Sequence, residues 1–137
     1  MKIFCSFAQT GEDTRLVQER MERVVALLTS LGHEVYCILF DAERDKFQMN
    51  GEFLKLALGN IKQYDHVLAI VTSERRSEGM LMEIGAAIEL GKPIYLLQHE
   101  SSVGKTYLPE IADKHKTWLD EDDLILQLKI LYSVHSK

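Results

Sequence analysis

Apolar residues in this chain form short continuous runs, separated by longer stretches in which they recur every three or four positions. The continuous runs are typical of buried strands. They predict strands at residues 2–7, 33–40, 65–72, 93–98 and 116–119. The periodic stretches predict amphipathic helices, because one face of an α-helix repeats about every 3.6 residues. These helices are expected from Thr10 or Asp13 to about Leu31, and at residues 52–63, 77–91, 107–114 and 120–132.

Local signals mark the ends of these elements. Gly32 and Gly91 follow two of the predicted helices, and glycine commonly ends a helix. Asp120 is expected to cap the last helix, with acidic residues at the positive end of its dipole. The polar segments 41–51 and 99–105 are expected to be loops.

The alternation of strands and helices predicts an α/β fold. With right-handed crossovers, the strands form a single flavodoxin-like (Rossmann-like) doubly wound parallel sheet of four or five strands, within one domain at residues 1–137. Ligands bind such sheets beyond the carboxyl ends of the strands. Residues 6–11, 41–50, 73–83 and 99–105 are expected at that edge.

The segment 77–93 carries the most informative chemistry at this edge. Glu83 lies near the start of a predicted helix, where the dipole is positive and backbone N–H groups are free. We therefore expect its carboxylate to stay ionised at neutral pH, which suits a nucleophile or a stabiliser of developing positive charge. Gly79 and Gly85 would leave this carboxylate facing an open cleft. The plainer interpretation is a solvated helix glutamate.

Charge and hydropathy narrow the set of partners. A formal net charge of −5 argues against binding a nucleic acid polymer, but one local pocket can still bind a small phosphorylated ligand. No apolar run approaches the roughly 18 residues of a membrane span. The N-terminal apolar run is too short for a signal peptide, so the cytoplasm is the expected location.

Cysteine, histidine and glycine spacings predict neither a metal nor a cofactor. Cys5 and Cys37 fall inside apolar runs and are expected to be buried reduced thiols rather than a disulfide. The five histidines are scattered, without a ligand spacing, so no metal site is predicted. Neither a dinucleotide-binding fingerprint nor a P-loop spacing is present.

Three segments carry recognisable motifs, at residues 65–72 (DHVLAIVT), 77–87 (SEGMLMEIGAA) and 91–93 (GKP). Together these motifs resemble those of the nucleoside 2-deoxyribosyltransferase superfamily. Residues 4–6 (FCS) together with 11–13 (GED) look like the smaller branch of that superfamily, the 2′-deoxynucleoside 5′-monophosphate N-glycosidases.

This resemblance implies a reaction and a set of site residues. The glutamate that matches Glu83 attacks C1′ of the sugar, so Glu83 would be the nucleophile that cleaves or exchanges an N-glycosidic bond. The position of Ser77 contacts the phosphate in the monophosphate hydrolases, which favours a nucleoside 5′-monophosphate over a free nucleoside. Ser77 and Gly79 would cradle phosphate or sugar, and Ser6 and Gln9 would line the other wall.

Position 57 departs from the family pattern. Members usually carry an Asp there, which assists departure of the base by proton chemistry, whereas this chain has Ala57. Glu52, Asn60 or Asp41 could take over that role, and Asp41 is also a candidate substrate contact. Otherwise the protein cleaves slowly or only binds its ligand.

Other positions refine the expected site. Leu81 stands where the family often has a glycine, and is expected to narrow the cleft beside the nucleophile. Lys92 and Lys105 are conceivable phosphate partners, although solvated lysines are the plainer interpretation. Members of the superfamily usually form dimers or larger assemblies, so a homo-oligomer is expected.

Two alternatives to glycosidic-bond chemistry on nucleosides stay open. The opening strand, the acidic helix start and a glutamate in the helix after the central strand also look like TIR-type domains, some of which cleave NAD. The second alternative is a non-catalytic nucleotide-binding module of the same fold.

Overall fold

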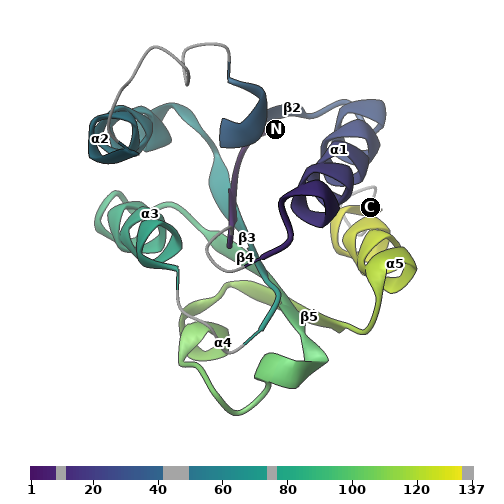
Figure 1. The fold of residues 1–137 in the computed structure, drawn as a ribbon. Coiled ribbons are helices and arrows are strands. Elements are labelled where there is room, and N and C mark those ends of the chain that lie inside the picture. Colours follow the sequence, from purple (N-terminus) through teal and green to yellow (C-terminus); the bar gives the residue numbers. More distant parts are fainter. Residues whose placement is uncertain (9–11, 42–49, 74–76, 134–137) are drawn as a thin grey trace.

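The computed structural model describes residues 1–8, 12–41, 50–73 and 77–133. Its strands form one parallel sheet in the order β2-β1-β3-β4-β5 (Figure 1). They are β1 (Lys2–Phe7), β2 (Glu34–Cys37), β3 (His66–Val71), β4 (Ile94–His99) and β5 (Lys114–Trp118). The predicted α/β fold with a parallel sheet is therefore confirmed, with five strands.

Helices cover both faces of this sheet. They are α1 (Thr14–Ser30), α2 (Asn50–Asn60), α3 (Glu78–Glu89), α4 (Leu108–Ile111) and α5 (Glu121–Ser133). Figure 1 shows α1 and α5 together on one face, with α2 and α3 together on the other. The described connections include short 3-10 turns, η1 (Ile38–Phe40), η3 (Ile61–Gln63) and η4 (Glu100–Ser102).

Side-chain caps and glycines fix the ends of the longer helices. Of the two candidate caps for α1, Asp13 fills the position, and its Oδ1 accepts a hydrogen bond of 3.0 Å from the Leu16 amide. Gly32, with φ +91°, and Gly91, with φ +70°, follow the C-terminal ends of α1 and α3 in the left-handed region that favours glycine. The local sequence therefore specifies where these helices begin and end.

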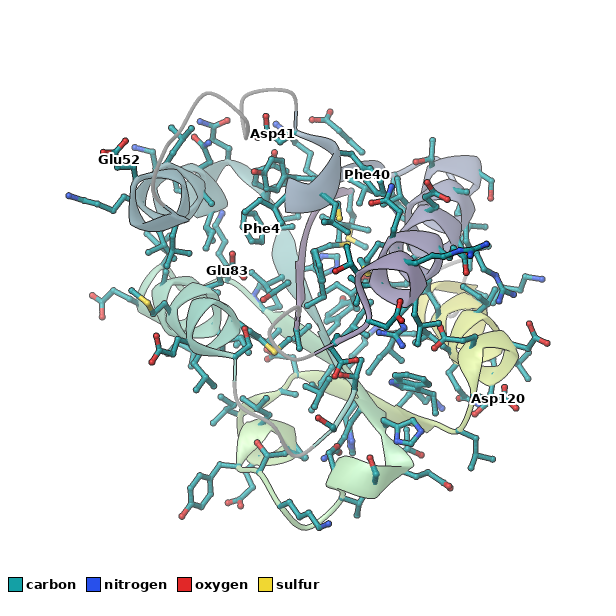
Figure 2. The ribbon with its side chains drawn as sticks, in the orientation of Figure 1. Phe4, Phe40, Asp41, Glu52, Glu83 and Asp120 are labelled. Carbon is teal, nitrogen blue, oxygen red and sulfur yellow. The ribbon has the colours of Figure 1, made fainter. Side chains whose placement is uncertain are left out.

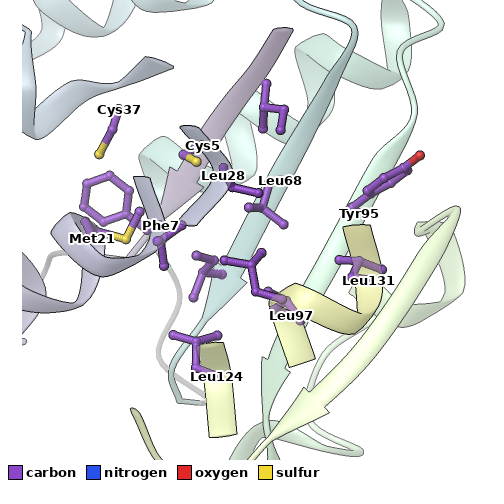
Figure 3. Packing of buried hydrophobic residues seen from close by; sticks show 14 of the residues in the cluster. Cys5, Phe7, Met21, Leu28, Cys37, Leu68, Tyr95, Leu97, Leu124 and Leu131 are labelled. Carbon is purple, nitrogen blue, oxygen red and sulfur yellow. The ribbon is translucent and has the colours of Figure 1, made fainter. Parts of the chain in front are cut away.

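The hydrophobic core has two layers because side chains of a strand alternate between the faces of the sheet. One layer packs Met21, Leu28, Leu124 and Leu128 of α1 and α5 against strand residues that include Leu68 (Figure 3). The second layer lies under α2 and α3 and contains Phe4, Ala57, Ile61, Val67, Ala69, Ile84 and Leu96. The first layer anchors the sheet, and the second forms the floor of the site described below.

Several predicted elements differ in extent from the observed ones, among them the helix expected at 52–63, which is α2 (Asn50–Asn60) followed by η3. The strand expected at 33–40 ends at Cys37, and Ile38–Phe40 curl into η1. As an edge strand, β2 pairs only with β1, so its last apolar residues are free to leave the sheet. The last strand begins at Lys114 rather than 116, because pairing with β4 includes its polar residues. The helix expected at 107–114 is the single turn α4.

Two further expectations can be compared with the structure. Cys5 and Cys37 are both buried and neither forms a disulfide, as predicted, and they are register partners in β1 and β2. In the described part of the chain, no helix is both long enough and apolar enough to cross a membrane.

Candidate active site

Ser6 and Glu83 meet where the carboxyl end of β1 passes under α3. Phe4 on β1 and Ala8 just after it belong to the core layer under α2 and α3, and by alternation Ser6 shares that face. Its Oγ donates a hydrogen bond of 2.6 Å to Oε1 of Glu83. Ser6 is 1% exposed and Glu83 is 8% exposed. Ser6 was predicted to line a wall of the site, and here it holds the predicted nucleophile.

Burial raises the pKa of Glu83 to about 7, and the hydrogen bond from Ser6 opposes part of that rise. The expectation that Glu83 is fully ionised at neutral pH is therefore wrong. Glu83 lies in the second turn of α3, since the helix begins at Glu78, so it is beyond the free N–H groups of the first turn. The loss of hydration on burial raises the pKa of this carboxylate by more than the remaining effect of the helix dipole lowers it.

A second polar pair lies beside Glu83, at the end of the neighbouring strand. The hydroxyl of Tyr36 on β2 donates a hydrogen bond of 2.9 Å to Oδ2 of Asp41. Burial raises the pKa of Tyr36, and the hydrogen bond to Asp41 and the charge of Glu83 add to that rise. Figure 2 shows Glu83 on α3, on the side of the sheet where Phe4 and Asp41 also lie.

Aromatic packing fixes the position of Tyr36. Phe4 pairs with Tyr36 in the register of β1 and β2, and their rings stack with centroids 5.2 Å apart. Tyr64 packs against both rings, at centroid distances of 5.7 Å and 6.0 Å. The sequence analysis did not single out Tyr36. The alternation of side chains along the strand expected at 33–40 could have indicated which face Tyr36 occupies. It becomes informative only when the pairing of β2 with β1 is known.

A cavity of about 240 Å³ opens on the other side of Glu83. Its described polar lining residues are Ser73, Ser77, Lys105 and Thr106. The other described lining residues are Tyr107 and the apolar Ala8, Val71, Met80, Leu81, Leu108 and Ile111. Leu81, expected to narrow the cleft, lines this cavity. Among the described residues, Glu83 does not line it, although Ala8 follows Ser6 by two residues and Met80 precedes Glu83 by one helical turn.

Ser77 has a structural role as well as a place in the cavity. It is the N-cap of α3, and its Oγ accepts a hydrogen bond of 3.3 Å from the Met80 amide. Gly79 lies in the first turn, and the nearest atom to a methyl group added there would be Cδ1 of Leu54, at 4.0 Å. Space therefore does not require a glycine at this position, and Gly79 is not among the described lining residues of the cavity.

The structure separates the other predicted residues. Ala57 is 1% exposed and belongs to the core layer under α2, while Glu52 is exposed on the far side of that helix (Figure 2). Asn60 is half-buried at the end of α2. Lys92 precedes β4 and so lies at the amino edge of the sheet, opposite the cavity. Gln9 lies outside the described residues.

No group of three or more His, Cys, Asp or Glu side chains in the described segments could hold a metal ion. The polar groups that the structure brings together are thus a buried carboxylate with its serine, a tyrosine with its aspartate, and a cavity with one lysine and several hydroxyls. This combination suits a small ligand with both polar and apolar parts.

Solved structures share this architecture. A CMP N-glycosidase, BcmB, from Clostridium botulinum is 21% identical, with a TM-score of 0.72, and the match covers 96% of this chain and 99% of that one. A 2-deoxyribosyltransferase from Bacillus psychrosaccharolyticus is 26% identical, with a TM-score of 0.60 and coverage of 93% and 96%. The solution structure of BlsM is 18% identical, with a TM-score of 0.70 and coverage of 99% and 94%.

Sequence comparison gives the family. A search among curated proteins found no match to this chain. The family model for nucleoside 2-deoxyribosyltransferase matches residues 11–123, which include α1, α3 and every strand after β1. The chain therefore belongs to the nucleoside 2-deoxyribosyltransferase family.

Proposed function

We propose that this protein cleaves or exchanges the N-glycosidic bond of a nucleoside 5′-monophosphate, with Glu83 as the nucleophile. The observation that carries the proposal is the buried hydrogen bond between Ser6 and Glu83, at the carboxyl edge of the sheet and next to a cavity. A carboxylate held in place by one donor and shielded from water is suited to attack a sugar carbon.

The reaction proceeds in two steps. In the first, an ionised Oε of Glu83 forms a bond to C1′ as the bond from C1′ to the base breaks, and the base leaves with the bonding electrons and takes up a proton from solvent. In the second, water or another base forms a bond to C1′ and gives up a proton to solvent, while the bond from C1′ to Oε breaks and its electrons return to Glu83 as a carboxylate. Both steps pass through a transition state with positive charge on the sugar, which the carboxylate stabilises.

The pKa of Glu83 suits its proposed role as the nucleophile. A value of about 7 leaves a large fraction of the carboxylate ionised at neutral pH. Its conjugate acid is also weak enough for the carboxylate to be a better nucleophile than an ordinary exposed glutamate. The hydroxyl of Ser6 keeps the pKa from rising further, so it helps to hold Glu83 in its reactive form.

The cavity is the proposed site for the phosphate end of the substrate. Ser77 and Lys105 line it, and Ser77 is the N-cap of α3, so the N-terminus of that helix lies at the cavity. A helix N-terminus with a neighbouring lysine suits a phosphate group. This arrangement supports a 5′-monophosphate over a free nucleoside.

A homodimer is the proposed assembly. Leu56 on α2 and Leu81, Met82 and Ile88 on α3 are exposed apolar side chains on two helices that contact each other. Exposed apolar side chains on adjacent elements are common at subunit contacts. Sedimentation velocity measures the assembly directly, and Met82→Glu is expected to shift it toward the monomer.

Release of free base tests the reaction. The protein is incubated with ribo- and deoxyribonucleoside 5′-monophosphates of the common bases, and free base is measured by chromatography. Glu83→Gln is expected to abolish release, whereas Glu89→Gln, an exposed glutamate on the same helix, should leave it unchanged. Adding a second free base separates transfer from hydrolysis. Ligand binding without base release, unaltered in Glu83→Gln, would instead favour a non-catalytic nucleotide-binding module.

A further inference from the structure

Three features follow one another along the carboxyl edge of the sheet. The order β2-β1-β3-β4 places the Tyr36–Asp41 pair at the end of β2 and Ser6 with Glu83 at the end of β1. The cavity lies beyond the ends of β3 and β4. Neighbouring strands are about 4.8 Å apart, so each feature lies roughly one strand from the next.

A substrate bound as proposed must follow the same line. Its phosphate occupies the cavity on the β3 and β4 side, and its C1′ lies at Glu83. The base is joined to C1′ on the side away from the phosphate, so it extends toward the end of β2. The polar groups of the described chain at that end include the Tyr36 hydroxyl and the Asp41 carboxylate.

This pair has a defined hydrogen-bonding character. The Tyr36 hydroxyl donates to Oδ2 of Asp41, so its hydrogen is already used, and the carboxylate offers only acceptors. The stacking of Tyr36 on Phe4 holds the pair in place before any ligand binds. A preorganised acceptor favours a ligand that brings a donor and rejects one that brings another acceptor.

From this juxtaposition we propose that Asp41 selects the base, by accepting a hydrogen bond from an exocyclic amino group. Cytosine and adenine carry such a group, whereas uracil and hypoxanthine carry a carbonyl oxygen at the corresponding position. The preferred substrates are then the 5′-monophosphates of cytosine and adenine nucleosides. Asp41 is a specificity-determining residue, Tyr36 positions it, and the inference rests on the proposed function for the placement of the sugar at Glu83.

The test compares matched substrate pairs that differ at one position of the base. The ratio of kcat/KM for CMP over UMP, and for AMP over IMP, is measured for the wild type and for Asp41→Asn, with the deoxy forms in parallel. The wild-type ratio is expected to exceed about ten, because one hydrogen bond to a charged group supplies roughly that much discrimination. In Asp41→Asn the ratio should fall about tenfold or more. Tyr36→Phe, which keeps the carboxylate but not its anchor, should lower the ratio by less.

Glu89→Gln is the control, since it removes an exposed carboxylate on α3 and should leave both ratios unchanged. Equal or better turnover of UMP and IMP by the wild type would overturn the inference. So would an equal loss for both members of each pair in Asp41→Asn. Affinities of the same nucleotides for Glu83→Gln separate this inference from the reaction itself. If no base is released but CMP and AMP still bind about tenfold more tightly than UMP and IMP, the reaction fails and the selectivity stands.

Discussion

Ser6 on β1 and Glu83 on α3 are 77 positions apart in the chain, yet their side chains share a buried hydrogen bond of 2.6 Å. The bond links the end of a central strand to the second turn of the helix that packs over it. It also opposes the effect of burial on the pKa of Glu83. Several properties of the protein are therefore expected to depend on this contact.

Ser6→Ala should move the pH dependence of activity upward. The reactive form of Glu83 is the ionised one, so kcat/KM should rise with pH through a midpoint near the pKa of about 7. Without the hydroxyl of Ser6, the pKa rises further and the midpoint moves to higher pH. A pH profile of base release measures this midpoint. Ser6→Thr, which keeps a hydroxyl, is the control and should leave the midpoint near that of the wild type. An unchanged midpoint in Ser6→Ala would show that the contact does not act on the reacting group.

The stability of the fold should fall as pH rises from about 4.5 to about 7. The pKa of Glu83 is about 7 in the folded protein and 4.5 ordinarily, so the folded state holds a proton that the unfolded state has released. Stability is then lost with rising pH across this window, by a total on the order of 3 kcal/mol. Urea unfolding across the window measures the loss. Glu83→Gln should remove most of it, and Glu89→Gln should not.

Ser77 allows the structural and the ligand-binding roles of one residue to be separated. Ser77→Ala removes the N-cap of α3 and should lower the free energy of unfolding by about 1 kcal/mol. Ser77→Asp keeps a good cap, so the free energy of unfolding should stay near that of the wild type. Its added negative charge should weaken the binding of a 5′-monophosphate about tenfold or more, with little effect on a free nucleoside. Equal weakening for both ligands would contradict a phosphate at this position.

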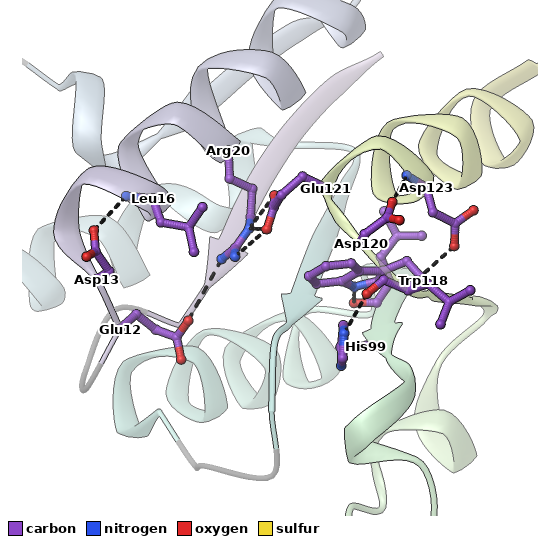
Figure 4. Close-up of polar contacts among 11 residues, drawn as sticks. Glu12, Asp13, Leu16, Arg20, His99, Trp118, Asp120, Glu121 and Asp123 are labelled. Atoms are coloured by element: carbon purple, nitrogen blue, oxygen red, sulfur yellow. Dashed lines mark hydrogen bonds and ion pairs between the residues drawn. The ribbon is translucent and has the colours of Figure 1, made fainter.

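Two ion pairs between α1 and α5 should differ in their contribution to stability. Arg20 binds Glu121 through Nε and Nη2, with a shortest distance of 2.7 Å, and its Nη1 lies 4.0 Å from Glu12 (Figure 4). The Arg20 side chain is only 5% exposed, and its guanidinium lies 5.5 Å from the centre of the Trp118 ring. Removing one partner of such a pair leaves a partly buried charge behind, so Arg20→Ala should cost about 3 kcal/mol.

Arg23 provides the matched control on the same two helices. It pairs with Asp122 at 3.0 Å, but the two side chains are 46% and 92% exposed. Arg23→Ala should therefore cost less than about 1 kcal/mol. Urea unfolding measures both variants. Similar losses for Arg20→Ala and Arg23→Ala would mean that burial does not set the strength of these pairs.

Much of the site could be located from the sequence, because the signals for it are local. The residues of 77–91 predict a helix after a central strand, and the carboxyl-edge rule places its start at the ligand edge. Glu83 was identified in this way, whereas the role of Ser77 came from the family resemblance. The same rule also applies to Lys92, which directly precedes the strand expected at 93–98, so it indicates the amino edge for Lys92 and the carboxyl edge for Lys105.

The state of Glu83 could not be predicted from its position in a helix. Its pKa depends on how much water the sheet and α3 exclude, and that is a property of packing between segments far apart in the chain. Tyr36 was missed for a related reason. Its role depends on β2 lying beside β1 and on the stacking of Phe4 in register with it.

The sequence by itself determined the alternation of strands and helices, most of their ends and the α/β class, because periodicity and capping act over a few residues. It also placed a glutamate near the start of the helix that follows the central strand. Only the tertiary structure decided the order and register of the strands, and with them the contacts of Ser6 with Glu83 and of Tyr36 with Asp41. These contacts join residues from separate elements, so their distances and the pKa of Glu83 follow from packing rather than from any local pattern.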